Sequence, residues 1–178
     1  MRVIAGTHRG RRLAAPRGRD TRPTSDRVRE ALFSILGPLD GERVLDLFAG
    51  SGALGIEALS RGAGSALFCD RSPAAAAAVR SNLQALGLQA DVVCDDARQV
   101  LRDAHGRGAT YDLVFLDPPY RQAEQWAADL SVLVPAILAP EGRVVSESDR
   151  RAPLRLTLPL GDERRYGDTL IRIYAHDT

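Results

Sequence analysis

The sequence predicts an α/β fold in which a mostly parallel β-sheet is covered by helices on both faces. Segments typical of strands alternate with segments typical of helices over most of the chain after residue 43. The strand segments, such as RVLDLF (43–48) and YDLVFLD (111–117), are largely apolar, as expected of strands buried on both faces of a parallel sheet. With 178 residues, of which 44% are hydrophobic, the chain is long enough for one domain with a substantial core.

The first part of the chain is expected to form a hairpin and then a helix. RVIAG and RRLAA flank a turn that contains Gly6, which predicts a short N-terminal β-hairpin. Ser25 can cap a helix whose apolar residues recur on one face, and Gly37-Pro38 ends that helix. We therefore divide the chain into a basic N-terminal hairpin or arm, residues 1–24, and a second domain, residues 25–178.

Strands and helices then alternate. Strands are predicted at 43–48, 65–70, 90–95, 111–117 and 142–148. Helices are predicted at 53–61, 72–86, 97–103 and 122–138. The helix at 72–86 is the best marked, with Pro73 in its first turn and Gly87 after its end. A final hairpin is expected from 154–158 and 168–175. Ligands of such sheets bind at the carboxyl ends of the strands, so the functional residues should follow them.

Several classes of protein are disfavoured by the composition. The longest apolar runs are far shorter than the roughly 20 residues that span a bilayer, so we expect no membrane contact. The first residues lack the apolar core of a secretory signal, which favours a cytoplasmic protein. Cys69, Cys94 and three scattered histidines form no metal-ligand spacing, and we expect no metal.

The charge is unevenly distributed, although the net charge is only +1. Residues 1–29 hold nine arginines and two acids, whereas the remaining residues hold 15 arginines and 21 acids. A basic segment on an acidic body indicates a polyanionic partner, although a solvated, flexible arm is the alternative. We hypothesise that RNA phosphates are bound by Arg9, Arg11, Arg12 and Arg22.

The first strand of the alternating region runs into a glycine-rich loop, DLFAGSGALG. Gly50, Gly52 and Gly55 match the G-x-G-x-x-G fingerprint of dinucleotide sites, and Asp70 ends the next strand. Alone, this pattern would indicate a nicotinamide or flavin enzyme. Asp46 lies near the end of the strand, four residues before Gly50, and favours another ligand. A carboxylate there would repel a pyrophosphate but would attract a cationic ligand. S-adenosylmethionine has a sulfonium and an ammonium group and no phosphate.

Further acids follow the other strands. Asp70 is placed to bind two ribose hydroxyls. In CDDA, Asp96 and the backbone N–H of Ala97 could recognise the adenine ring, although the acids could equally cap a helix. The candidate residues for binding the methyl donor are Thr24, Asp46, Phe48, Gly50, Gly52, Asp70, Arg71, Asp96 and Ala97.

The strand at 111–117 ends in DPPY, whose residues fit chemistry on an exocyclic amine. Such a nitrogen is a poor nucleophile until acceptors on its N–H bonds make it more tetrahedral. Asp117 can supply one acceptor and the carbonyl of Pro118 another, while Pro119 stiffens the turn. Tyr120 offers a flat face for an extruded base. A turn that merely ends the strand is the alternative, and it is less consistent with the nearby acids and glycines.

Taken together, these stretches resemble a known family. The sequence is similar to bacterial small-subunit (16S) ribosomal RNA guanine-N2 methyltransferases of the RsmD type, which are class I S-adenosylmethionine-dependent enzymes. The resemblance is carried by MRVIAGTHRGRRL, RPTSDRVREALFSIL, VLDLFAGSGALGIEALSRGA, VFLDPPY and YGDTLIRIY. It implies a Rossmann-like, seven-stranded sheet with an antiparallel C-terminal hairpin, S-adenosylmethionine as donor and a guanine as acceptor. Two positions depart from the family pattern: Asp70 stands where the family often has Glu, and Ser72 stands where an acid is frequent. These departures leave the finer cofactor geometry open.

Three rival functions remain. DPPY also suits adenine N6 or cytosine N4, so a DNA methyltransferase is the first rival, although such enzymes usually carry an additional recognition domain. A non-catalytic RNA-binding module would not need Asp117 and Tyr120 beside an intact glycine loop. An oxidoreductase would need a catalytic acid or base that we do not find. We expect a monomer that acts on ribosomal RNA within the small subunit or an assembly intermediate.

Overall fold

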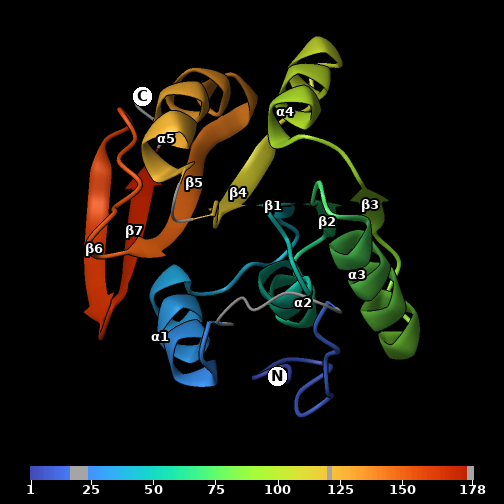
Figure 1. The fold of residues 1–178 in the computed structure, drawn as a ribbon. Coiled ribbons are helices and arrows are strands. Elements are labelled where there is room, and N and C mark those ends of the chain that lie inside the picture. The colour runs from blue at the N-terminus through green and yellow to red at the C-terminus, as the bar shows by residue number, and fades with distance from the viewer. Residues whose placement is uncertain (17–23, 120–121, 176–178) are drawn as a thin grey trace.

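The computed structural model describes residues 1–16, 24–119 and 122–175. Within these ranges, seven strands form a single sheet in the order β3-β2-β1-β4-β5-β7-β6 (Figure 1). The first five strands are parallel, whereas β7 pairs antiparallel with both β5 and β6. The predicted mostly parallel, seven-stranded α/β fold with an antiparallel C-terminal hairpin is therefore confirmed.

The elements follow the predicted alternation. The strands are β1 (Arg43–Leu47), β2 (Ser65–Cys69), β3 (Asp91–Val93), β4 (Tyr111–Leu116), β5 (Leu138–Asp149), β6 (Leu160–Tyr166) and β7 (Thr169–Ala175). The helices are α1 (Asp26–Leu36), α2 (Ala53–Ser60), α3 (Pro73–Leu86), α4 (Ala97–Gly106), α5 (Ala123–Leu133) and the short 3-10 helix η2 (Pro135–Ile137). None of the helices in the described ranges is long and apolar enough to cross a bilayer.

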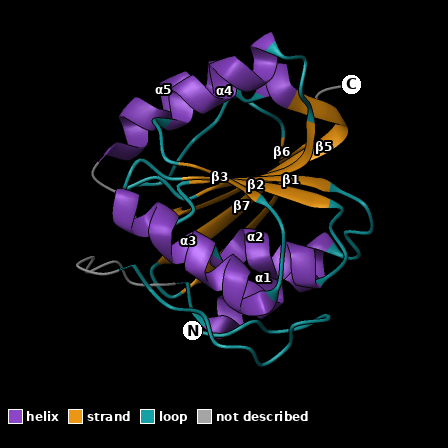
Figure 2. Ribbon diagram, turned by 90° about the vertical axis from the view of Figure 1, so that its right-hand side faces the viewer, coloured by secondary structure: helices purple, strands orange, loops and turns teal. Residues whose placement is uncertain are grey.

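Two helical layers cover the sheet (Figure 2). On one face, α1, α2 and α3 bury residues such as Phe33 and Val79 against Phe68 and Phe115 of the sheet. On the other face, α4 and α5 pack Trp126 and neighbouring side chains against the opposite side of the same strands. Alternate residues of the central strands β1, β2 and β4 therefore belong to different cores, which fixes the face to which their side chains point.

Three predicted boundaries were wrong. The helix predicted at 122–138 ends at Leu133, because Pro135 has no N–H with which to continue the helical hydrogen bonds. The next strand, β5, begins at Leu138 and not at residue 142 as predicted. The first strand of the C-terminal hairpin is β6, not 154–158. This edge strand, LGDERRY, is largely polar and exposed, so its sequence lacks the apolar alternation of a buried strand.

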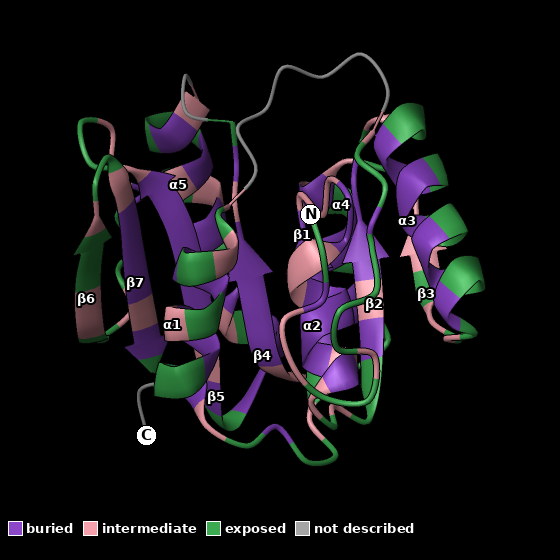
Figure 3. Cartoon of the chain, turned by 90° about the horizontal axis from the view of Figure 1, so that it is seen from below, coloured by how far each residue is buried: buried purple, intermediate pink, exposed green. Residues whose placement is uncertain are grey.

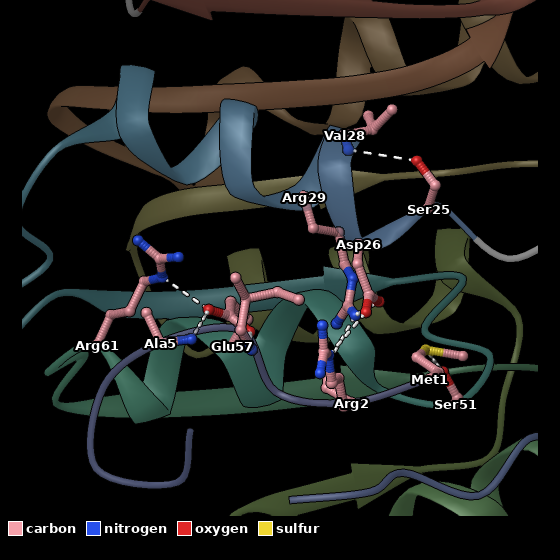
Figure 4. A network of polar contacts seen from close by, with 11 residues as sticks. Met1, Arg2, Ala5, Ser25, Asp26, Val28, Arg29, Ser51, Glu57 and Arg61 are labelled. Atoms are coloured by element: carbon pink, nitrogen blue, oxygen red, sulfur yellow. Dashed lines mark hydrogen bonds and ion pairs between the residues drawn. The ribbon is translucent and has the colours of Figure 1, made fainter. Parts of the chain in front are cut away.

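The N-terminal residues form a short antiparallel hairpin with a compact turn, as predicted. One antiparallel bridge joins Arg2 to Arg12, and further backbone hydrogen bonds close the turn. The carboxylate of Glu57 in α2 accepts hydrogen bonds from the N–H groups of Ile4 and Ala5 at 2.7 and 3.0 Å and from Arg61 (Figure 4). Within residues 1–16, Val3 and Leu13 belong to the main core. The division of the chain at residue 24 stays a prediction.

Candidate active site

The carboxyl ends of β1, β4 and β5 bring three acids to one face of the sheet. Asp46 pairs in register with Phe115 of β4, and Leu116 pairs with Ser146 of β5. Asp117 therefore follows at the level of Glu147, on the same face as Phe115. The charges of Glu147 and Asp46 add to burial in raising the pKa of Asp117 well above its ordinary value. The sheet thus gathers partly desolvated carboxylates beneath the segment that leads into α1.

Asp46 is the most deeply placed of the predicted donor-binding residues. Its side chain is 2% exposed, and Oδ2 accepts a hydrogen bond of 2.9 Å from the N–H of Gly55 in α2. Burial raises its pKa from 3.8 to about 7, opposed by the Gly55 hydrogen bond and assisted by the charge of Asp70. A carboxylate held in this way gains from a nearby cation, which would favour its ionised form.

The glycine loop between β1 and α2 has the backbone geometry that its sequence predicts. Phe48, Gly50 and Gly52 all adopt positive φ angles, of 64°, 58° and 79°. A Cβ at Gly50 would meet nothing within 4 Å, whereas one at Gly52 would lie 3.2–3.3 Å from the side chains of Val79, Ile56 and Phe68. Gly50 therefore leaves open space beside the loop, and Gly52 is required for the packing of the loop onto the core.

Phe48 is held in its unusual conformation by a neighbour from α5. Its ring packs edge-on against Trp126, with 4.8 Å between the centroids. The guanidinium of Arg98 covers the Trp126 ring at 3.9 Å and pairs with Asp129. This stack supports the loop from the side opposite to α2.

Asp70 is oriented by the backbone on both sides. Its Oδ2 accepts from the N–H of Gly50 at 3.0 Å, and its Oδ1 accepts from the N–H of Ser72 at 2.9 Å. These bonds tie the carboxyl end of β2 to the glycine loop. Arg71, the next residue, is exposed. Ser72 caps α3, with its hydroxyl accepting a hydrogen bond from the N–H of Ala75.

The acids after β3 lie further along the same edge. Asp96 is the N-cap of α4, with Oδ1 accepting from the N–H of Arg98 at 2.9 Å, and Ala97 is buried behind it. The capping role left open by the sequence is therefore present in the structure. The remaining lone pairs of Asp96 and its partial exposure are compatible with a further contact to a ligand.

The DPP turn lies directly at the end of β4. Asp117 is partly exposed, Pro118 is buried and Pro119 is exposed, with its carbonyl accepting from the N–H of Gln122 at 3.0 Å. Tyr120, predicted to stack on the target base, lies outside the described residues, as does Arg22. Asp117 thus faces the same side of the sheet as Asp46 of the neighbouring strand β1. It therefore lies about one strand spacing from the glycine loop, which follows β1.

Glu147 belongs to this site although the sequence analysis did not include it. It is 4% exposed in β5, and its Oε2 accepts a short hydrogen bond from the hydroxyl of Thr24. Burial raises its pKa, which the Thr24 bond and the charge of Arg29 oppose. The rule that led to Asp46 and Asp117, an acid near the carboxyl end of an apolar strand, applies equally to VVSES and would have found it. Thr24, predicted to contact the donor, is therefore tied to the acid cluster.

The N-terminal turn that carries Arg9 and Arg11 is held against the ends of two helices. The N–H of Thr7 donates to the carbonyl of Ser60 at the end of α2, and Arg11 donates to the carbonyl of Ala85 at the end of α3. These helix ends lie at the opposite edge of the sheet from Asp117, and Figure 3 shows the turn running away from the carboxyl ends of β2 and β4. Arg9 is exposed on this turn, and Arg12 lies nearer the glycine loop. The turn is drawn to this edge because Glu57 and Ser60 bind its backbone.

The site has the features that a donor such as S-adenosylmethionine requires. The open space beside Gly50 lets a ligand approach the backbone, and buried Asp46 lacks a cationic partner among the interactions that set its pKa. Asp70 lies between the loop and α3, where a ribose would pass. Within the described residues, no group of three or more potential metal ligands occurs.

The chain matches a known family over nearly its whole length. A model of the family described as "Conserved hypothetical protein 95" matches residues 1–175. The Bacillus subtilis protein YlbH, whose name gives it a provisional rRNA methyltransferase role, is 43% identical over 180 residues, with 98% of each chain covered.

Two Escherichia coli proteins extend the comparison. Ribosomal RNA small subunit methyltransferase D is 43% identical over 124 residues, which cover 68% of this chain and 61% of that protein. The solved structure of YhhF, provisionally named a methyltransferase, superposes with a TM-score of 0.83 at 36% identity, covering 100% of this chain and 98% of the other. The sequence similarity is thus accompanied by the same fold throughout.

Proposed function

Because the chain belongs to the conserved hypothetical protein 95 family, we propose that it transfers a methyl group from S-adenosylmethionine to the exocyclic N2 amine of a guanine in 16S ribosomal RNA. One observation of the structure carries the proposal. The turn that begins with Asp117 stands one strand away from a glycine loop with open space beside it and a buried acid beneath it. A donor site and a candidate amine acceptor therefore lie side by side.

The donor site is assigned to residues of β1, β2 and the loops that follow them. The donor supplies a methyl group on a sulfonium, whose positive charge makes that group electrophilic. Asp46 contributes a negative charge under the loop, Gly50 allows close approach of the backbone, and Asp70 offers carboxylate lone pairs to ribose hydroxyls. Phe48, Arg71, Asp96 and Ala97 complete the proposed pocket, and the stack of Phe48 on Trp126 holds one wall in place.

The target amine is assigned to the turn after β4. Asp117 accepts a hydrogen bond from one N–H, and the carbonyl of Pro118 accepts from the other, so that the nitrogen lone pair turns toward the methyl group. As the N–C bond formed, the bond between the donor's sulfur and its methyl carbon would break and neutral S-adenosylhomocysteine would leave, while the amine lost one proton to Asp117 or to water. The raised pKa of Asp117 makes its carboxylate a stronger base than an exposed aspartate, since its burial disfavours the charged form. Positioning and electrostatics supply most of the rate.

The wider context is proposed from the relatives. Their names give ribosomal RNA of the small subunit as substrate, which favours RNA over DNA for this chain. We assign the protein to the bacterial cytoplasm, where it would act as a monomer on the small subunit or its assembly intermediate. Arg9, Arg11, Arg12 and Arg22 stay predicted phosphate contacts, with Arg12 the best placed of those described.

The decisive experiment measures the acceptor. Purified protein is incubated with tritiated S-adenosylmethionine and either small-subunit rRNA from a strain lacking this activity, assembled small subunits, or double-stranded DNA. We expect label in RNA, recovered as N2-methylguanosine by mass spectrometry. Label in DNA, or in adenosine or cytidine of RNA, would overturn the assignment of the acceptor. If the protein bound the donor but transferred no methyl group to any of these substrates, the proposal that it is a methyltransferase would be overturned.

A further inference from the structure

A groove lined by arginines lies at the β7–β6 end of the sheet, several strands away from the glycine loop after β1. It encloses about 300 Å³ and is lined by Arg150, Arg151, Pro153, Arg155, Arg165, Leu170 and Arg172. Five of its seven lining residues are arginines, which come from the connection after β5 and from the hairpin of β6 and β7. We propose that this groove, called here the arginine groove, binds phosphates of the RNA strand beside the target nucleotide; this inference rests on the proposed function.

The position of the groove is fixed by strand register. Asp117 lies level with Glu147 of β5, and Arg150 follows three residues later, about 10 Å further in the strand direction. Asp149 pairs with Thr169, so the turn between β6 and β7 lies at the same edge. The groove therefore lies at the carboxyl edge that carries Asp117 but on the other face of the sheet, because Leu170 and Arg172 alternate with Ile171, which pairs with Glu147. RNA bound there reaches the target site around this edge, whereas Arg11 lies toward the other edge.

The groove is a positive region on an otherwise acidic body. Residues 149–172 hold six arginines and four acids, whereas residues 30–148 hold nine arginines and 16 acids. Phosphates approaching the acids Asp46, Asp117 and Glu147 meet repulsion, so an RNA strand needs nearby cations to reach this edge. The arginine groove supplies such cations.

The internal ion pairs leave the groove able to accept an anion. Arg150 and Arg151 share one carboxylate, that of Asp168, at 3.2 and 3.6 Å, and their side chains are 54% and 72% exposed. Within the described ranges, no carboxylate forms an ion pair with Arg155. Exposed pairs of this kind contribute little stability, so a phosphate can replace Asp168 at small cost. Guanidinium groups also match phosphate geometry with two parallel hydrogen bonds.

Arg172 has a different role, because its charge is already satisfied. It is 7% exposed, and its Nε donates to Glu163 at 2.9 Å while Nη1 donates to the carbonyl of Leu154 at 3.2 Å. These bonds fix the connection after β5 against β7. Arg172 is therefore a positioning residue that holds the exposed arginines in place, and it is kept unchanged in the test.

The test compares two triple variants with the same loss of charge. The groove variant replaces Arg150, Arg151 and Arg155 with Gln. The control variant replaces Arg80, Arg102 and Arg107 with Gln, and these exposed residues belong to α3, α4 and the end of α4. Binding of unmodified small-subunit rRNA is measured by filter retention from 50 to 300 mM salt, alongside the KM for RNA, kcat and the dissociation constant for S-adenosylmethionine.

We expect the groove variant to bind RNA about fivefold more weakly per lost contact at 0.1 M salt, with a salt slope flatter by about 0.7 per contact. Its KM for RNA should rise, while kcat at saturating RNA and donor affinity stay within twofold of the wild type. The control variant should show the wild-type salt slope. An equal salt slope in the groove variant and the wild type would overturn the inference.

A variant that is expected to bind RNA more tightly provides a second test, because misfolding cannot explain tighter binding. Asp168→Asn removes the carboxylate that competes for Arg150 and Arg151 but keeps the backbone carbonyl that accepts from the N–H of Arg150. It should tighten RNA binding and steepen the salt slope, whereas unchanged binding would contradict the inference. If the groove served an acidic protein, both sets of variants would bind RNA like the wild type. Because binding is measured directly, a lack of methyl transfer would count against the proposed function alone.

Discussion

Replacing Asp46 with Asn should separate the stability of this protein from its affinity for the donor. The pKa of Asp46 is raised from 3.8 to about 7, chiefly by burial. A group with a raised pKa in the folded state stabilises the fold below its unfolded pKa, and that stability is lost as the pH rises through the folded pKa. Since one pKa unit corresponds to about 1.4 kcal/mol, Asp46 should cost the free protein about 4 kcal/mol between pH 4 and pH 7.

Asp46→Asn removes this titration but keeps an oxygen that can accept from the N–H of Gly55. Between pH 5 and pH 8, the free energy of unfolding of the variant should therefore improve by about 2.5 kcal/mol relative to the wild type. Asp117 and Glu147 also have raised pKa values, so both proteins should retain part of the downward trend with pH. Urea unfolding followed by circular dichroism at several pH values measures the difference.

Donor binding should change in the opposite direction. A cationic donor favours ionised Asp46, so the affinity of the wild type should rise about tenfold per pH unit below pH 7 and level off above it. Asp46→Asn should bind the donor weakly, with little of this dependence. Calorimetric titration with S-adenosylmethionine from pH 5.5 to 8 tests this. The assigned role of Asp46 would be refuted if the free energy of unfolding changed with pH equally in both proteins and the donor affinity of the wild type did not change with pH.

Four shorter predictions concern the same site. Asp117→Ala should abolish methyl transfer while calorimetric donor affinity is retained, and substantial activity in the folded variant would exclude Asp117 as the amine acceptor. Gly50→Ala should fold at a cost of about 1–2 kcal/mol for its left-handed backbone and lose donor binding, whereas Gly41→Ala, with a similar φ and equally open space, should bind normally. Asp70→Ala should weaken donor binding by about 1.5–3 kcal/mol, as measured by calorimetry; unchanged affinity would place the ribose elsewhere. Glu147→Gln should raise the free energy of unfolding relative to the wild type, and by more at pH 8 than at pH 5.5, because it removes a buried acid with a raised pKa. Equal differences at the two pH values in urea titrations would show that the pKa of Glu147 is not raised.

The parallel part of the fold was predictable because each strand is apolar on both faces and each helix has clear ends. Ser25, Ser72 and Gly87 stand at the ends of helices as their residue types predict. The edge strand β6 was missed because one of its faces and its outer edge meet solvent, so burial imposes no pattern on its sequence. In that case pairing with β7 decides the structure, and pairing partners are not visible in a local pattern.

The candidate site was predictable where chemistry is confined to one motif and not where it depends on long-range packing. The glycine loop and Asp117 follow from their own segments. The position of the N-terminal arginines does not, because it depends on Glu57 and Ser60, more than 50 residues away. The packing role of Gly52 is likewise invisible in its own segment, because a side chain there would press on Val79 and Phe68.

The docking of the N-terminal turn also determines the order in which the chain can fold. Its partners lie between 52 and 78 positions later in the sequence: Ala5 binds Glu57, Ala14 binds Asn82, and His8 reaches Leu86. During synthesis these first residues therefore emerge long before the helices that hold them, and contacts of such high sequence separation form slowly. A nascent chain shorter than about 86 residues leaves Val3 and Leu13 without their core, so the beginning of this protein is among the last parts to be fixed.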